Sequence, residues 1–254
     1  MNAIAPLPDD KSKAPAVDGA LDILEALTQS TLPLTLSEIS SRVGMPPATC
    51  HRIVGTLLRR ELVVRDLQRK KSYCIGARLF QMASTAYFQQ PVVSMFHSIA
   101  DVLKNELHEA VNLSVLAGSK ALVVANVVWP FSDAYGRYVG QTSMLHEDAS
   151  GKAIMSMQPA FVQKLYWDEF IHPGTSAGLS LEAWQQELAA IKRVGYALTQ
   201  TEGAPGFYTL ATAVLNRRGE PLAAMSVSFA NNKDVRPHVT PLVQACWQLS
   251  ARLG

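Results

Sequence analysis

Apolar residues recur at helical spacing three times near the start of the chain. Residues 17–29 predict a first helix, residues 36–42 a second and residues 47–61 a third, with a polar, proline-containing break at residues 30–35. The sides expected to face a core carry Val17, Ala20, Leu21, Leu24 and Leu27 in the first helix, Leu36, Ile39 and Val43 in the second, and Cys50, Ile53, Val54, Leu57 and Leu58 in the third.

The residues around these helices predict how they are joined. Gly44 suits a left-handed C-cap for the second helix, while Pro46 and Pro47 suit the first turn of the third, where a missing N–H costs little. Residues 62–65 and 72–75 are short runs typical of β-strands, joined by a polar turn. Three helices followed by a hairpin predict a winged helix-turn-helix.

The rest of the chain alternates between helical and strand-like patterns. After a helix at residues 77–89 that Pro91 ends, helices are expected at 92–108, 150–157, 160–170, 181–193 and 238–252, and strands at 111–117, 121–128, 196–200, 207–215 and 221–229. Hairpin-connected strands with helices at intervals indicate a mainly antiparallel sheet covered by helices, an α+β arrangement. The expected parts are a disordered tail at 1–14, a winged helix-turn-helix domain at 15–76, a linker helix at 77–90 and a larger α+β domain at 91–254.

Three of the expected strands have one bulky face and one small or polar face. The bulky positions are Val111, Leu113, Val115, Leu210, Val214, Met225, Val227 and Phe229, and the small or polar positions are Asn112, Ser114, Thr209, Ala211, Ala213, Ala224, Ser226 and Ser228. The bulky faces can pack under helices. The small, polar faces can either line a pocket for a small polar ligand or form a partly solvated side of the sheet.

Positive charge is concentrated in one segment. Residues 42–71 carry eight basic and two acidic side chains, a net charge of +6, whereas the residues from 81 onward carry 12 basic and 13 acidic ones. This concentration fits either contact with a polyanion or an ordinary solvated basic face. The chain is 48% apolar and 17% charged, which is typical of a soluble globular protein, and we expect no membrane segment.

The residues that could carry chemistry do not predict an enzyme. Cys50, Cys74 and Cys246 are few and far apart, which suggests reduced thiols in the cytoplasm, and neither a metal nor another cofactor is expected. Residues 174–178 match the G-x-S-x-G motif of hydrolases, with Ser176 as the nucleophile, but that motif needs a buried strand before the serine. The preceding Ile-His-Pro does not predict one, so a serine hydrolase remains only a remote alternative.

A helix-turn-helix presents the start of its recognition helix to base edges in the major groove of double-stranded DNA. The side chains expected to contact DNA are Thr49, His51, Arg52 and Arg59 on the third helix, and Arg69, Lys70 and Lys71 at the tip of the hairpin. Thr49 can bind a phosphate, and Arg52 can pair bidentately with a guanine. Each of these residues taken alone is equally well an ordinary surface residue, and it is their ordered set that favours DNA binding.

The chain resembles the IclR family of transcription regulators. The resemblance lies in VDGALDILEALTQ, LTLSEISSRVGMPPATCHRIVGTLLRRELVVRD and IGARLF, and it continues in NLSVLAGSKALVVANVV, GQTSMLHEDASGKAIM, IKRVGYALTQTEGAPGFYTLATAV and AAMSVSFA. It covers residues 16–254 and implies a winged helix-turn-helix joined by a linker helix to a GAF-like effector-binding domain. It further implies homodimers or homotetramers on palindromic operator DNA and a small-molecule effector. We expect a repressor, with an activator as the alternative.

The resemblance also implies where the effector binds. The site would lie between the small, polar face of the sheet and residues 146–152, closed by the loop at 199–206. The matching positions are Ala149, Ser150, Thr199, Thr209, Ser226 and Ser228, with Tyr135, Arg137 and His146 as further candidate walls. Family effectors are often small carboxylates or aromatic acids. The alternative is a C-terminal domain that only joins copies of the chain.

Three departures from the family pattern bear on specificity. Position 199 is commonly acidic in the family, and Thr199 removes that charge. The hairpin turn at residues 67–71 is longer than usual, and Pro47 and Ala48 stand where lysine and serine are frequent. We expect these departures to affect which effector and which operator sequence are recognised.

Overall fold

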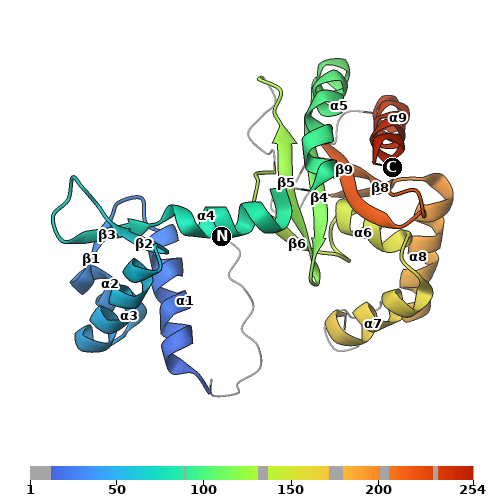
Figure 1. Cartoon of the computed structure of the whole chain (residues 1–254). Helices are drawn as coiled ribbons and strands as arrows, with labels where there is room; N and C mark the ends of the chain where they lie inside the picture. The colour runs from blue at the N-terminus through green and yellow to red at the C-terminus, as the bar shows by residue number, and fades with distance from the viewer. Residues whose placement is uncertain are drawn as a thin grey trace. The chain divides into compact units, whose positions relative to one another are not determined.

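The chain folds as two compact units, Met1–Ala86 and Tyr87–Gly254 (Figure 1). The computed structural model describes residues 13–88, 90–130, 137–171, 180–200, 206–230 and 234–253. The division lies inside the segment expected to form the linker helix, which begins with α4 (Ala77–Ala83) and continues as a π-helical turn, η1 (Ser84–Phe88). Each unit has its own hydrophobic core.

The N-terminal unit is a three-helix bundle edged by a small sheet. Its elements are α1 (Pro15–Thr28), β1 (Leu34–Thr35), α2 (Leu36–Val43), α3 (Pro47–Arg59), β2 (Val63–Arg65) and β3 (Ser72–Ile75). The predicted helix-turn-helix and hairpin are therefore present. Gly44 has the expected left-handed conformation, with φ of 64°, and ends α2.

Two details of this unit differ from the sequence prediction. β1 was expected to be part of a loop, but Leu34 and Thr35 pair with Tyr73 and Ser72 of β3. Two residues are too few to show an alternating pattern. The third helix ends at Arg59 rather than at Glu61, because Glu61 turns out of the helix with φ of 58°.

The buried side of α1 was predicted only in part: Leu27 is buried, and Ala20 and Leu24 pack against the core as expected. Its buried residues are Gly19, Ile23 and Leu27, whereas Val17 and Leu21 are 58% and 54% exposed. Apolar residues run along two sides of this helix, so periodicity alone did not identify the buried one. Gly19 lies on the buried side, where an added side chain would meet the ends of the Met45 and Ile53 side chains.

The C-terminal unit is built on a six-stranded antiparallel sheet with the order β6-β5-β4-β9-β8-β7. The strands are β4 (Ala110–Ala117), β5 (Lys120–Val127), β6 (Thr142–Met144), β7 (Ala197–Gln200), β8 (Phe207–Leu215) and β9 (Pro221–Ala230). The helices are α5 (Pro91–Leu107), α6 (Ala149–Ser156), α7 (Ala160–Phe170), α8 (Leu181–Val194) and α9 (Arg236–Arg252). β6 was not predicted, because only three residues form it.

Helices cover both faces of this sheet (Figure 1). α5 and α9 pack on the bulky face, where the core includes Phe96, Leu113, Met225 and Val227. α6 packs on the small face, backed by α7 and α8. The predicted α+β class and the predicted assignment of the two faces are confirmed. Among the described helices, none has both the length and the apolar composition that crossing a membrane requires.

Candidate functional site

One side of α3 anchors the helix and the other side is free. Cys50, Ile53, Val54 and Leu57 are buried in the core of the N-terminal unit. The four side chains predicted to contact DNA from this helix, Thr49, His51, Arg52 and Arg59, are all exposed. Arg59 donates from Nη2 to Thr56 Oγ1 at 3.0 Å, whereas the guanidinium of Arg52 makes no hydrogen bond or ion pair with any described residue. α3 therefore presents a free guanidinium close to its N-terminus.

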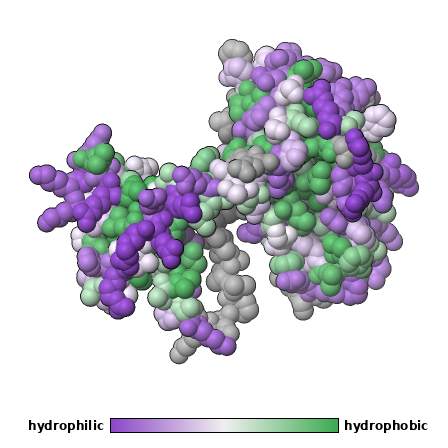
Figure 2. Space-filling view, in the orientation of Figure 1, coloured by the Kyte–Doolittle hydropathy of each residue, from purple (hydrophilic) through white to green (hydrophobic). Residues whose placement is uncertain are grey.

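Hydrogen bonds to the Asp66 side chain stabilise the turn of the β2–β3 hairpin. Asp66 Oδ1 accepts hydrogen bonds from the backbone N–H groups of Gln68 and Arg69, at 3.0 and 2.6 Å. Lys70 and Lys71 follow at the tip, exposed and without partners among the described residues. Hydrophilic side chains project from the unit that carries this hairpin (Figure 2).

The Arg69 side chain is bound to other residues of the N-terminal unit. Its Nη2 lies 2.8 Å from Glu38 Oε1 on α2, and its Nη1 donates to the carbonyl oxygen of Pro33 at 2.5 Å. The backbone N–H of Thr35 and the Arg69 guanidinium hold the pKa of Glu38 at about 2, so this carboxylate is ionised at neutral pH. Arg69 thus ties the hairpin to α2, and contact with a phosphate from this side chain stays a prediction.

The small face of the C-terminal sheet brings polar residues from five strands into rows. Directly paired residues share a face, so Thr199, Thr209 and Ser228 form one row. The next row consists of Ala197, Ala211, Ser226, Asn112 and Asn126, and the third of Ala213, Ala224 and Ser114. Thr209 and Ser228 hydrogen-bond to each other at 3.1 Å.

Three buried side chains on this face have no partner. Asn112, Ser114 and Ser226 are fully buried, and none of their side-chain polar atoms hydrogen-bonds to a described residue. Such groups are rare in folded proteins, because each costs about 1–3 kcal/mol when it is left unbonded. Asn112 and Ser226 face each other across the β4–β9 pair, so the unpaired donors and acceptors are concentrated at one place.

The N-terminus of α6 is held against this face. Asp148 caps the helix by accepting from the Gly151 N–H at 3.3 Å, and the Ala149 N–H donates to Thr199 Oγ1 at 3.1 Å. A side chain at Gly151 would lie 2.5 Å from the Leu145 backbone, so only glycine lets the first turn approach so closely. The threonine at position 199 therefore contacts the helix terminus that the family resemblance placed at the effector site.

The candidate cations around α6 carry no free positive charge. Arg137 is buried, pairs with Asp148 at 3.0 Å and donates to Ser143 Oγ at 2.8 Å, with Ser150 Oγ at 3.5 Å. His146 Nδ1 lies 2.9 Å from Tyr166 Oη, and burial lowers the pKa of His146 below 6.5. Tyr166 is also buried, and its burial raises its pKa to about 12. Arg137 and His146 are thus suited to position polar groups.

The structure therefore brings together much of the predicted effector site. Ala149 contacts Thr199, Thr209 contacts Ser228, and Ser226 is buried and unpaired, while Ser150 is buried beside Arg137. Asn112 and Ser114 were placed on the polar face by their alternation but were not predicted as site residues. Tyr135, Ser176 and residues 201–205 lie outside the described residues.

Together, an exposed cationic helix, a basic hairpin and a separate sheet domain define a winged helix-turn-helix transcription regulator with an attached effector-binding domain. Comparison with known families agrees. Residues 16–67 match the IclR helix-turn-helix domain, and residues 85–249 match the bacterial transcriptional regulator IclR C-terminal domain. The chain belongs to the IclR family, whose members are transcription regulators and not enzymes.

Individual relatives extend over most of the chain. The transcriptional repressor IclR of Escherichia coli is 27% identical over 241 residues, covering 89% of this chain and 88% of the relative. A helix-turn-helix transcriptional regulator of Mycobacterium tuberculosis is 31% identical over 209 residues, covering 82% of this chain and 79% of the relative.

Solved structures share the fold. The IclR protein of Thermotoga maritima has a TM-score of 0.77 at 21% identity, covering 94% of this chain and 99% of the other. An IclR homologue of Microbacterium hydrocarbonoxydans complexed with 4-hydroxybenzoate has a TM-score of 0.76 at 20% identity, covering 94% and 98%.

Proposed function

We propose that the chain is a cytoplasmic transcriptional repressor whose binding to double-stranded operator DNA is controlled by a small organic acid. In this proposal residues 15–76 bind DNA, 77–90 link the domains, and 91–254 bind the effector and join the chain into homodimers or homotetramers. Repression is supported by the names of relatives, which include an acetate operon repressor of Salmonella typhimurium.

The observation that carries the effector proposal is the group of unpaired side chains on the small face of the sheet. Asn112, Ser114 and Ser226 offer both donors and acceptors in a buried environment, where a hydrogen bond to a ligand would recover their cost. The adjacent α6 terminus, with Ala149 and Ser150, carries the positive end of the helix, although Asp148 and Thr199 already accept from the Gly151 and Ala149 N–H groups. A domain that only joined copies of the chain would have no use for these unpaired groups.

An organic acid fits these features and agrees with one relative. Hydroxyl and amide groups can donate to a carboxylate, and they can donate to or accept from a phenol. The 4-hydroxybenzoate bound to the Microbacterium hydrocarbonoxydans homologue is an acid of this class. Whether this chain takes the same acid is part of the test.

On the DNA side, we propose that Thr49, His51 and Arg52 reach bases or nearby phosphates while Arg59, Lys70 and Lys71 contact the backbone. Arg69 would act by fixing the orientation of the hairpin. Effector binding would alter DNA binding only through a different affinity for two arrangements of the assembled protein.

In the test, fluorescently labelled DNA from the region next to the gene that encodes this chain is titrated with the full chain at several salt concentrations, and binding is followed by fluorescence anisotropy. We expect salt-sensitive binding, and release of the DNA by 4-hydroxybenzoate or benzoate. No salt-sensitive binding to any duplex would overturn the whole proposal. DNA binding with neither an acid effect nor a rise in melting temperature from any acid would instead favour a domain that only oligomerises.

A further inference from the structure

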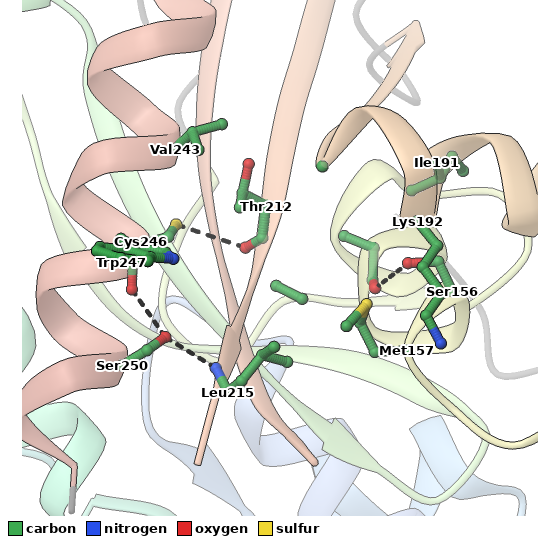
Figure 3. Close-up of a pocket in the computed structure, with 13 residues that line it drawn as sticks. Ser156, Met157, Ile191, Lys192, Thr212, Leu215, Val243, Cys246, Trp247 and Ser250 are labelled. Carbon is green, nitrogen blue, oxygen red and sulfur yellow. Dashed lines mark hydrogen bonds between the residues drawn. The ribbon is translucent and has the colours of Figure 1, made fainter. Parts of the chain in front are cut away.

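A hollow lies in the C-terminal unit beside the end of β8 (Figure 3). β7 pairs with residues 208–211 of β8, so among the described residues no strand on that side covers β8 from Thr212 to Leu215. α9 borders the hollow on one side, and the C-terminal ends of α6 and α8 border it on the other. The space between them, which we call the β8-edge cavity, has a volume of about 280 Å³.

The wall of the β8-edge cavity is mainly apolar. It includes Met157, Ile191, Val243 and Trp247. Trp247 is 80% exposed, although tryptophan is usually well covered in folded proteins. The volume lies near the lower end of ligand pockets, at about 300 Å³, and above the roughly 150 Å³ cavity that holds benzene. A ligand with a single ring fits this space.

One polar side chain in this wall is left without a partner. Thr212 is only 7% exposed, and its Oγ1 makes no hydrogen bond with any described residue. The polar groups around it are used: Cys246 Sγ donates to the Thr212 carbonyl oxygen at 3.6 Å, and Ser250 Oγ accepts from the Leu215 N–H at 2.9 Å. Since these neighbours are satisfied, Thr212 Oγ1 is the buried polar atom of this wall that lacks a partner among the described residues.

A positive charge stands in the same wall. Lys192 on α8 lines the β8-edge cavity and is exposed, and its ammonium group makes no hydrogen bond or ion pair with any described residue. We propose that the β8-edge cavity is a second small-molecule site that takes a monocarboxylic acid with a ring or a branched hydrocarbon body. The body contacts the apolar wall, the Thr212 hydroxyl hydrogen-bonds to the acid, and Lys192 attracts its charge.

This site differs in its polar residues from the proposed effector site, although Ala213 of the small face and the C-terminal end of α6 also line it. Thr212 lies on the opposite face of β8 from Thr209 and Ala211, which belong to the small face under α6. The proposal therefore does not rest on the effector proposal, and the two can fail independently.

The test is a titration of the ¹⁵N-labelled full chain with benzoate, followed through the indole N–H signal of Trp247, which Trp247→Phe identifies. We expect a saturable shift of this signal. Thr212→Val should weaken benzoate binding by about 2- to 10-fold, the range for one lost hydrogen bond, without lowering the melting temperature of the unliganded protein. Lys192→Gln should also weaken it, whereas Arg193→Gln, a control next to it on α8 and outside the cavity, should not.

Ser226→Ala provides the control for the effector site and should leave the Trp247 titration unchanged. The proposal is overturned if benzoate does not shift the Trp247 signal, or if Thr212→Val titrates like the wild type. It is also overturned if the signal moves with protein concentration in the absence of benzoate, because a second copy of the chain would then cover this surface.

Discussion

Buried hydroxyl groups in the C-terminal unit fall into two kinds. Thr209 and Ser228 satisfy each other, whereas the hydroxyl groups of Ser114, Thr212 and Ser226 have no partner among the described residues. For the unliganded fold, an unbonded buried hydroxyl is a cost, and replacing it with an apolar group of similar shape is neutral or favourable. Residues that lower stability in this way are expected where a ligand binds.

Ser226→Ala tests this difference. We expect the free energy of unfolding without ligand to stay unchanged or to rise by up to about 1–3 kcal/mol, because an unsatisfied group is removed. The DNA complex of the variant should no longer respond to the acid. Urea denaturation and DNA anisotropy measure the two effects. Ser228→Ala is the matched control, and since it breaks the bond to Thr209 it should lose about 0.5–1.5 kcal/mol of stability.

Arg52→Ala tests the recognition helix. Its guanidinium is exposed and unpaired within the described part of the chain, so we expect a loss of about 1–3 kcal/mol in operator binding and weaker discrimination at one base pair. Arg60→Ala, at the far end of α3, should have a smaller effect that is the same for all sequences. Equal losses for both variants would remove Arg52 from the base-reading residues.

At the scale of elements, the hairpin owes its orientation to α2. Glu38 closes a capping box with Thr35 and pairs with Arg69, so one carboxylate stabilises both the start of the helix and the position of the hairpin. Because Arg69 is paired with Glu38, the unpaired positive charges of the hairpin tip are those of Lys70 and Lys71.

The stabilisation by Glu38 should depend on pH. Its pKa in the folded protein is about 2, below the value of 4.5 for an unperturbed glutamate. Its contribution to stability is therefore complete above pH 4.5 and is lost as the pH falls toward 2. We expect the difference in melting temperature between wild type and Glu38→Gln to shrink over this interval. A carboxyl NMR titration of Glu38 with a midpoint near 4.5 would contradict the assignment.

The elements that the sequence predicted well are those with strong end signals. Ser180 caps α8 by accepting from the Ala183 N–H, and Gly195 ends it with φ of 85°. β1 and β6 were not predicted, because two or three residues show no periodicity and depend on pairing with distant strands. Alternation placed Asn112 and Ser114 on the polar face, but only the three-dimensional structure shows that neither has a partner.

At the scale of the whole molecule, the division into two units with separate cores predicts separable unfolding. We expect calorimetry of the full chain to resolve two transitions. Operator DNA should raise only the melting temperature of the transition assigned to the N-terminal unit, and a bound acid only that of the other transition. At a ligand concentration of 100 times Kd, each ligand should stabilise its unit by about 2.7 kcal/mol. Fragments that contain each unit alone would assign the transitions. A single transition shifted by both ligands would contradict this independence.

The short length of β7 has one more consequence. A strand border that no neighbouring strand covers is a template on which another chain can add a strand, which is a common start of aggregation. Here the border of β8 beyond residue 211 is flanked by α9, where Ser250 Oγ accepts a hydrogen bond from the Leu215 N–H. Helical side chains thus block growth of the sheet across its uncovered end, and the protein can leave this border open without promoting fibre formation.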